Sequence, residues 1–212
     1  MIGERIEAAG GNPDQVTLVA VTKAFPFSYI QVGIEAGLAD LGENYAQELA
    51  AKAAELTETA PDLAAAIRWH FIGGLQRNKV KLLAGTVALW HSVDRESLVD
   101  EIAKRSPGDR ILVQVNTTAE DQKSGCSAND AVRLVDRGRQ QGLIVAGLMT
   151  VGPTSADTDP RPGFAALRDL GQLCEVDELS MGMSGDFEIA IQEGSTMVRI
   201  GSALFGSRPV RE

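Results

Sequence analysis

Short apolar segments alternate with longer amphipathic ones along almost the whole chain. The first apolar segment, residues 16–21, is nearly continuous and β-branched, which is typical of a strand buried on both faces. The same pattern predicts strands at 16–21, 38–42, 67–72, 87–93, 111–115 and 143–151, and one more in each half of 179–206. Helical spacing predicts helices at about 1–14, 27–37, 45–57, 78–83, 95–105, 128–140 and 164–173, with another opening at Asp186.

This strict alternation of strand and helix favours an α/β fold built as a closed parallel (β/α)8 barrel, also called a TIM barrel. No change in composition marks a linker, so we expect a single domain over residues 1–212. An open doubly wound sheet is the alternative, although such sheets usually have fewer strands. In a barrel, the chemistry lies on the loops at the carboxyl ends of the strands.

Composition narrows the function classes. The net charge of −9, without a long basic cluster, argues against nucleic acid as a partner, and no apolar run reaches the roughly 18 residues of a membrane span. The N-terminus has no signal peptide pattern, and Cys126 and Cys174 stand apart, so we expect a reduced, cytoplasmic setting. His70 and His91 are the only histidines, which excludes a multi-histidine metal site.

Candidate site residues gather at the carboxyl ends of the predicted strands, where a barrel would bring them to one rim. These candidates are Lys23, Asn44, His70, Met149, Ser184, Arg199 and Gly201.

Lys23 directly follows the first apolar segment. A lysine is seldom buried without a reason, and loss of hydration lowers its pKa and frees the amine to form a Schiff base with a carbonyl. The alternative is a lysine whose ammonium group reaches solvent at the end of a strand.

Arg199 lies in mid-strand between Val198 and Ile200, so it points opposite to its apolar neighbours. Inside a barrel it needs an acceptor, and a ring nitrogen or an anion would serve. The alternative is an internal salt bridge to a barrel acid such as Glu43.

Two Gly/Ser turns, one around Ser184 and one at Gly201-Ser202, each follow a predicted strand. Such turns direct backbone N–H groups outward and suit a phosphate group, although Asp186 and Glu188 place negative charge nearby. The alternative is a pair of ordinary strand-to-helix turns.

Asn44 and His70 are weaker candidates. Asn44 could donate a hydrogen bond to a ligand, but asparagine is also a common helix N-cap. A lone histidine in a strand is more often a satisfied core residue than a functional one.

Several segments in one order resemble a known family. They are Val19-Ala20-Val21-Thr22-Lys23, Gly42-Glu43-Asn44-Tyr45, Trp69-His70-Phe71-Ile72-Gly73, Leu75-Gln76, Asn78-Lys79, Lys123-Ser124-Gly125, Gly147-Leu148-Met149 and residues 180–206. The set is similar to the pyridoxal phosphate homeostasis proteins, whose fold is the barrel of the alanine racemase N-terminal domain. The resemblance covers about residues 16–208; one departure is Gly74, where the family often carries proline.

The resemblance implies that Lys23 carries pyridoxal 5'-phosphate as a Schiff base. It implies that Ser184, Gly201 and Ser202 hold the phosphate and that Arg199 faces the pyridine nitrogen. Asn44, His70 and Met149 complete the implied cofactor site, which has no metal and no catalytic residue.

The implied function is intracellular buffering of this form of vitamin B6 and its delivery to apo-enzymes that use it. Racemases of this fold add a β-domain with a catalytic tyrosine, whereas this chain ends at Glu212 and its only tyrosines are Tyr29 and Tyr45. We therefore expect a monomeric carrier, not an enzyme. The alternatives are a slow amino-acid racemase with one base and a phosphosugar-binding barrel.

Overall fold

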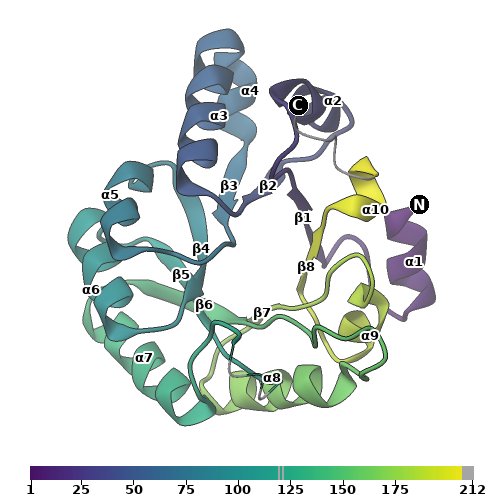
Figure 1. Cartoon of the computed structure of the whole chain (residues 1–212), viewed down its shortest axis with the longest axis vertical. Helices are drawn as coiled ribbons and strands as arrows, with labels where there is room; N and C mark the ends of the chain where they lie inside the picture. The colour runs from purple at the N-terminus through teal and green to yellow at the C-terminus, as the bar shows by residue number, and fades with distance from the viewer. Residues whose placement is uncertain (119, 121, 207–212) are drawn as a thin grey trace.

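The strands of the computed structural model close into one parallel barrel, shown end-on in Figure 1. The structure describes residues 1–118, 120 and 122–206, so the predicted domain end at 212 lies outside it. Each strand pairs with the next along the chain, and the last pairs with the first from Thr17–Met197 to Ala20–Ile200. This closing pair confirms the predicted barrel and rules out the open sheet.

The strands lie within one or two residues of most of the predicted segments. They are β1 (Thr17–Val21), β2 (Asp40–Glu43), β3 (Arg68–Phe71), β4 (Val87–Val93), β5 (Arg110–Gln114), β6 (Ile144–Met149), β7 (Glu178–Ser180) and β8 (Met197–Ile200).

The helices surround the barrel (Figure 1). They are α1 (Ile2–Ala8), α2 (Phe27–Glu35), α3 (Ala46–Thr59), α4 (Pro61–Ala66), the 3-10 turn η1 (Arg77–Lys79), α5 (Val80–Leu83), α6 (Glu96–Arg105), α7 (Ala128–Gln140), α8 (Arg161–Leu173), α9 (Phe187–Gln192) and α10 (Ser202–Phe205). The predictions missed α4 and α10 and made α1 too long. Across the described ranges, no helix combines the length and apolar character that crossing a membrane requires.

Apolar clusters both outside and inside the strands hold the barrel together, and two of them bear on the site. The larger one lies between the strands and the surrounding helices and includes Leu41, Trp90 and Phe164. The smaller one joins side chains of strands that are not neighbours, so it must cross the barrel interior. Its buried members are Val19, Leu89, Leu112, Met149 and Met197. The interior is therefore packed, and the barrel is not a channel.

Candidate functional site

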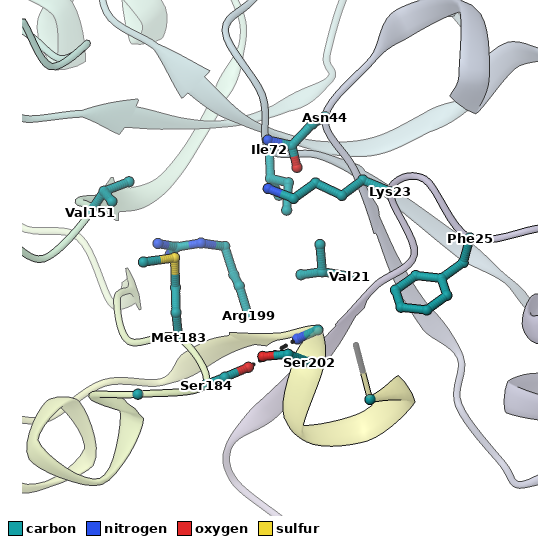
Figure 2. Close-up of a pocket in the computed structure, with 13 residues that line it drawn as sticks. Val21, Lys23, Phe25, Asn44, Ile72, Val151, Met183, Ser184, Arg199 and Ser202 are labelled. Carbon is teal, nitrogen blue, oxygen red and sulfur yellow. Dashed lines mark hydrogen bonds between the residues drawn. The ribbon is translucent and has the colours of Figure 1, made fainter. Parts of the chain in front are cut away.

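A cavity of about 650 Å³ opens at the carboxyl ends of the strands (Figure 2). Its wall comes mainly from residues that follow β1, β2, β3, β6, β7 and β8. It includes Val21, Lys23, Phe25, Asn44, Ile72, Val151, Met183, Ser184, Gly185, Arg199, Gly201, Ser202 and Gly206. Six of the eight residues that the sequence predicts for the site thus share one cavity.

Lys23 is half-buried, and Figure 2 shows its amine directed into the cavity. The residues on either side of it are fixed by acids. The hydroxyl of Thr22 donates to Glu43 at 2.7 Å, and the N–H of Ala24 donates to Glu48 at 2.7 Å. Ala24 adopts a φ of 63°, a conformation that favours glycine, so this hydrogen bond holds a strained residue in place.

Lys52, on the inner face of α3, joins these acids. Its ammonium group donates to Glu43 at 2.6 Å, to Glu48 at 2.7 Å and to the carbonyl of Thr22 at 2.7 Å. Burial raises the pKa of Glu43 more than the hydrogen bonds from Lys52 and Thr22 lower it. A buried ion cluster therefore lies directly behind the Lys23 backbone.

Arg199 reaches the cavity from β8 and is only 4% exposed. Its guanidinium donates to the hydroxyl of Ser180 at 2.7 Å and to the carbonyl of Thr150 at 2.8 Å. Burial lowers the pKa of Arg199 to about 10, and the charge of Asp186 opposes that effect. The group therefore stays charged at neutral pH, and the salt bridge to Glu43 considered as an alternative does not form.

The two Gly/Ser turns meet at the floor of the cavity in Figure 2. The backbone N–H groups of Gly201 and Ala203 both point at the hydroxyl oxygen of Ser184, at 3.4 and 3.3 Å. Gly182, two residues before Ser184, packs closely against α9: its φ is 94°, and a Cβ there would lie 2.6 Å from Ala190. Two N–H donors of one turn thus converge on the hydroxyl of the other turn.

The two acids near these turns each accept a hydrogen bond, but only one of them faces away from the cavity. Asp186 accepts a hydrogen bond from the N–H of Met183 at 2.6 Å, and Glu188 accepts one from Arg5 at 2.8 Å. The carboxylate of Glu188 is thus held by α1 on the outside of the barrel, and only Asp186 adds negative charge near the cavity.

Asn44 lies beside Lys23 in the cavity wall, next to the exit of β3. A Cβ on Gly73 would come within 2.0 Å of the Asn44 carbonyl oxygen, so glycine is required for this close approach. The side-chain oxygen of Asn44 is buried and makes no hydrogen bond within the described chain. Tyr45 occupies the N-cap of α3, so Asn44 does not have the capping role considered as an alternative.

His70 and Met149 are not in the wall of the cavity. Met149 packs in the inner apolar layer, and His70 is 3% exposed inside the barrel, bonded to Asp40 and His91. The reason is strand alternation: both side chains point inward below the rim, where neighbouring side chains cover them.

The polar residues behind the cavity that were not among the candidates include Asp40, Lys52, His91 and Ser180. The burial of Lys52 could have been predicted from the sequence, because this lysine falls on the same helical stripe as Leu49 and Leu56. A lysine on a buried stripe requires a partner. The others come from separate strands, and their proximity depends on the closed barrel.

The fold and the cavity define the class of protein to which this chain belongs. The sequence model of the alanine racemase N-terminal domain matches residues 4–209. The alanine racemase of Clostridium difficile superposes with a TM-score of 0.73 over 98% of this chain and 56% of the racemase, at 13% identity, which speaks for the fold alone.

Within that class the relatives are more specific. The pyridoxal phosphate homeostasis proteins of Pseudomonas aeruginosa and Aquifex aeolicus are each 40% identical to this chain and cover 98% of it, with 91% and 93% of their own lengths matched. PipY of Synechococcus elongatus was solved with pyridoxal phosphate (PLP) bound. Its structure superposes on this chain with a TM-score of 0.80 at 30% identity, and the match covers 97% of this chain and 100% of PipY. The chain therefore belongs to the pyridoxal phosphate homeostasis protein family, which confirms the resemblance.

Proposed function

We propose that this protein binds pyridoxal 5'-phosphate in the cavity at the carboxyl ends of the strands and serves in its intracellular homeostasis. The observation that carries the proposal is the meeting of Lys23, Arg199 and the Ser184 turn in one cavity. PipY, which is similar over nearly the whole chain, was solved with this group bound.

The residues present fit the group. A cavity of about 650 Å³ has room for one pyridine ring with its phosphate. The Ser184 hydroxyl and the N–H groups near Gly201 and Ser202 would hold the phosphate at one end. Lys23 and Asn44 would meet the ring near its other substituents, and the buried oxygen of Asn44 offers an acceptor that lacks a donor in the described chain.

When bound, the group supplies an aldehyde carbon that an unprotonated lysine amine can bond reversibly, with loss of water. Lys23 would provide that amine. Arg199 would face the ring nitrogen as a donor, and because an arginine does not give up its proton at working pH, that nitrogen would stay unprotonated. An unprotonated ring is a poor electron sink, which disfavours carbanion chemistry.

A racemase needs a base on each side of its substrate. Among the described residues that line the cavity, the titratable side chains are Lys23 and Arg199, and there is no tyrosine or histidine. Tyr29 and Tyr45 are 41% and 57% exposed and lie outside the wall. The cavity therefore suits holding the cofactor better than turning over amino acids.

We extend the proposal to a cytoplasmic monomer that passes the cofactor to apo-enzymes. The free state of Cys126 and Cys174 accords with a reducing compartment. Light scattering of the purified protein with and without the cofactor tests the monomer, and transfer to a purified apo-enzyme tests delivery.

The deciding experiment is the visible spectrum of the protein with added pyridoxal phosphate, followed by borohydride reduction and peptide mapping. We expect a yellow protein with phosphopyridoxyl on Lys23. Lys23→Arg, which keeps the charge, should fold and remain unlabelled, whereas Lys79→Ala, a lysine of the neighbouring cavity, should label normally. A protein that stays colourless and unlabelled would refute the proposal.

The racemase alternative has a separate test. We expect no exchange of the amino-acid Cα hydrogen with deuterium in heavy water when the loaded protein is incubated with L-alanine. Exchange that disappears in Lys23→Arg would show that the protein is an enzyme.

A further inference from the structure

Five buried polar side chains form a continuous path across the barrel interior, from the cavity to the opposite end. The path runs Arg199–Ser180 at 2.7 Å, Ser180–His91 at 3.0 Å, His91–His70 at 2.8 Å and His70–Asp40 at 2.9 Å. None of the five is more than 8% exposed. We call this set the relay. It joins β8, β7, β4, β3 and β2, so it crosses between strands that are not neighbours in the sheet.

The direction of every hydrogen bond in the relay follows from its two ends. Arginine is only a donor, so the oxygen of Ser180 accepts from Arg199, and the Ser180 hydroxyl is then able to donate to Nδ1 of His91. His91 donates from Nε2 to Nδ1 of His70, and His70 donates from Nε2 to Asp40. With both rings uncharged, each proton lies on the cavity side of its bond, and both histidines are Nε2–H tautomers.

An extra proton on either histidine breaks this order. Nδ1 of His91 would become a donor to Ser180, whose oxygen would then accept from two sides. The Ser180 hydroxyl hydrogen would have no recorded acceptor in the described chain, at a position that is 0% exposed. Consistent with this, burial lowers the pKa of His91 well below its usual range, and the charge of Arg199 adds to the effect.

The far end of the relay is anchored. Asp40 accepts a fork of two hydrogen bonds from Arg68, at 2.7 and 2.5 Å, and the two residues are paired at the start of β2 and β3. Burial raises the pKa of Asp40, but the hydrogen bonds from His70 and Arg68 outweigh it, so the net shift is downward. Asp40 is thus a fixed carboxylate that always accepts.

The relay holds the Arg199 guanidinium without a carboxylate at its side. The acceptors recorded for the guanidinium in the described chain are the Ser180 hydroxyl and the Thr150 carbonyl, both neutral. These two bonds fix the plane of the guanidinium, while its charge is not cancelled by direct contact with an acid. The charge remains available to a ligand in the cavity.

We propose that Ser180, His91 and His70 are positioning residues that act through this relay to hold Arg199 as a fixed, charged donor toward the bound ring. The inference rests on the proposed function, because the ligand is taken to be pyridoxal phosphate. None of the three needs to touch the ligand: Ser180 contacts Arg199, and the histidines fix Ser180 as a donor toward His91.

The first test needs no ligand. The chain has only two histidines, so nitrogen-15 NMR of the ring nitrogens of the free protein yields two ring systems, and His91→Gln assigns them. We expect both rings to carry their hydrogen on Nε2 at pH 8. A proton on Nδ1 of either ring, or a cationic ring, would overturn the relay.

The second test uses the loaded protein. Cutting the relay with Ser180→Ala should raise the dissociation constant of pyridoxal phosphate by ~10-fold or more and shift the pH midpoint of the visible band, because a hydrogen bond to a charged group is lost. The matched control is Ser195→Ala: Ser195 is also buried, but it donates only to backbone carbonyls such as that of Met181, at 2.8 Å. The control should destabilise the protein without moving the midpoint.

A double variant makes the route explicit. If the histidines act only through Ser180, the single variant His91→Gln should shift the pH midpoint of the visible band. The same substitution made in the Ser180→Ala variant should cause no further shift. An unchanged midpoint and dissociation constant in both folded single variants would overturn the inference. Absence of binding by the unaltered protein would instead overturn the proposed function, while the NMR result would still decide whether the relay exists.

Discussion

The two cationic residues of the cavity are supported in opposite ways. Behind Lys23 lies a compact ion cluster in which Lys52 contacts Glu43 and Glu48 within 2.7 Å. Behind Arg199 lies the relay, whose first carboxylate, Asp40, is reached only through three intervening side chains.

The difference follows from which atoms must stay still. The ion cluster bonds the carbonyl of Thr22 and the N–H of Ala24, so it fixes the main chain on either side of Lys23. Under the proposed function, Lys23 forms and releases a covalent bond, which needs a fixed main chain and a side chain that can rotate. The relay bonds the guanidinium of Arg199 itself, and a donor proposed to orient a ring works best when it does not move.

The strongest way to break this comparison is Lys52→Met. The variant leaves Glu43 and Glu48 without their cation, and Glu43 is 0% exposed, so we expect a loss of about 3–5 kcal/mol in the free energy of unfolding. Urea denaturation followed by circular dichroism measures it. Lys104→Met, at an exposed position of α6, should change stability by less than about 0.5 kcal/mol. A loss as small as that in Lys52→Met would mean that the cluster is not a support.

A substitution at the proposed phosphate site should have a smaller effect, and this effect depends on neither the ion cluster nor the relay. Ser184→Ala removes the hydroxyl on which two N–H groups converge and should weaken retention of pyridoxal phosphate by about 1–3 kcal/mol. Equilibrium dialysis measures the change. Ser97→Ala, at an exposed position of α6, is the control. Unchanged retention in Ser184→Ala would place the phosphate elsewhere in the cavity.

The sequence was sufficient for the barrel because its strands are strongly patterned. The apolar run of β1 and the regular alternation with helices required a parallel sheet covered on both faces. The missed helices are short and lack an amphipathic stripe long enough to recognise: α4 begins at Pro61, directly after the C-cap of α3, and α10 is a single turn after Gly201.

The residues at the rim of the site could also be predicted from the sequence, whereas the contacts in the barrel interior could not. Lys23, Asn44 and the two turns follow strands directly, so closing the barrel brings them together. The contact between His70 and His91 depends on a register shift between β3 and β4 at Trp69/His70. The sequence pattern of neither strand predicts this shift. The link from Ser180 to Arg199 likewise depends on how far each strand extends along the barrel.

The two supports also differ in how they should respond to pH. Because folding lowers the pKa of His91, this histidine binds a proton near pH 6.5 in the unfolded chain but not in the folded protein. The stability that His91 contributes is therefore fully present above that pH and is lost as the pH falls. The raised pKa of Glu43 has the opposite sign: its contribution is fully present below about pH 4.5 and is lost as the pH rises through the folded pKa.

Comparing His91→Gln and Glu43→Gln with the unaltered protein from pH 8 to 5 tests this contrast. The stability difference caused by His91→Gln should shrink as the pH drops below about 6.5, by up to about 1.4 kcal/mol per pH unit, because one proton is at stake. The difference caused by Glu43→Gln should shrink in the other direction, as the pH rises. Urea midpoints at each pH give both curves. If the two curves slope the same way, the ion cluster and the relay do not differ in the charge that folding buries, and the contrast between the two supports fails.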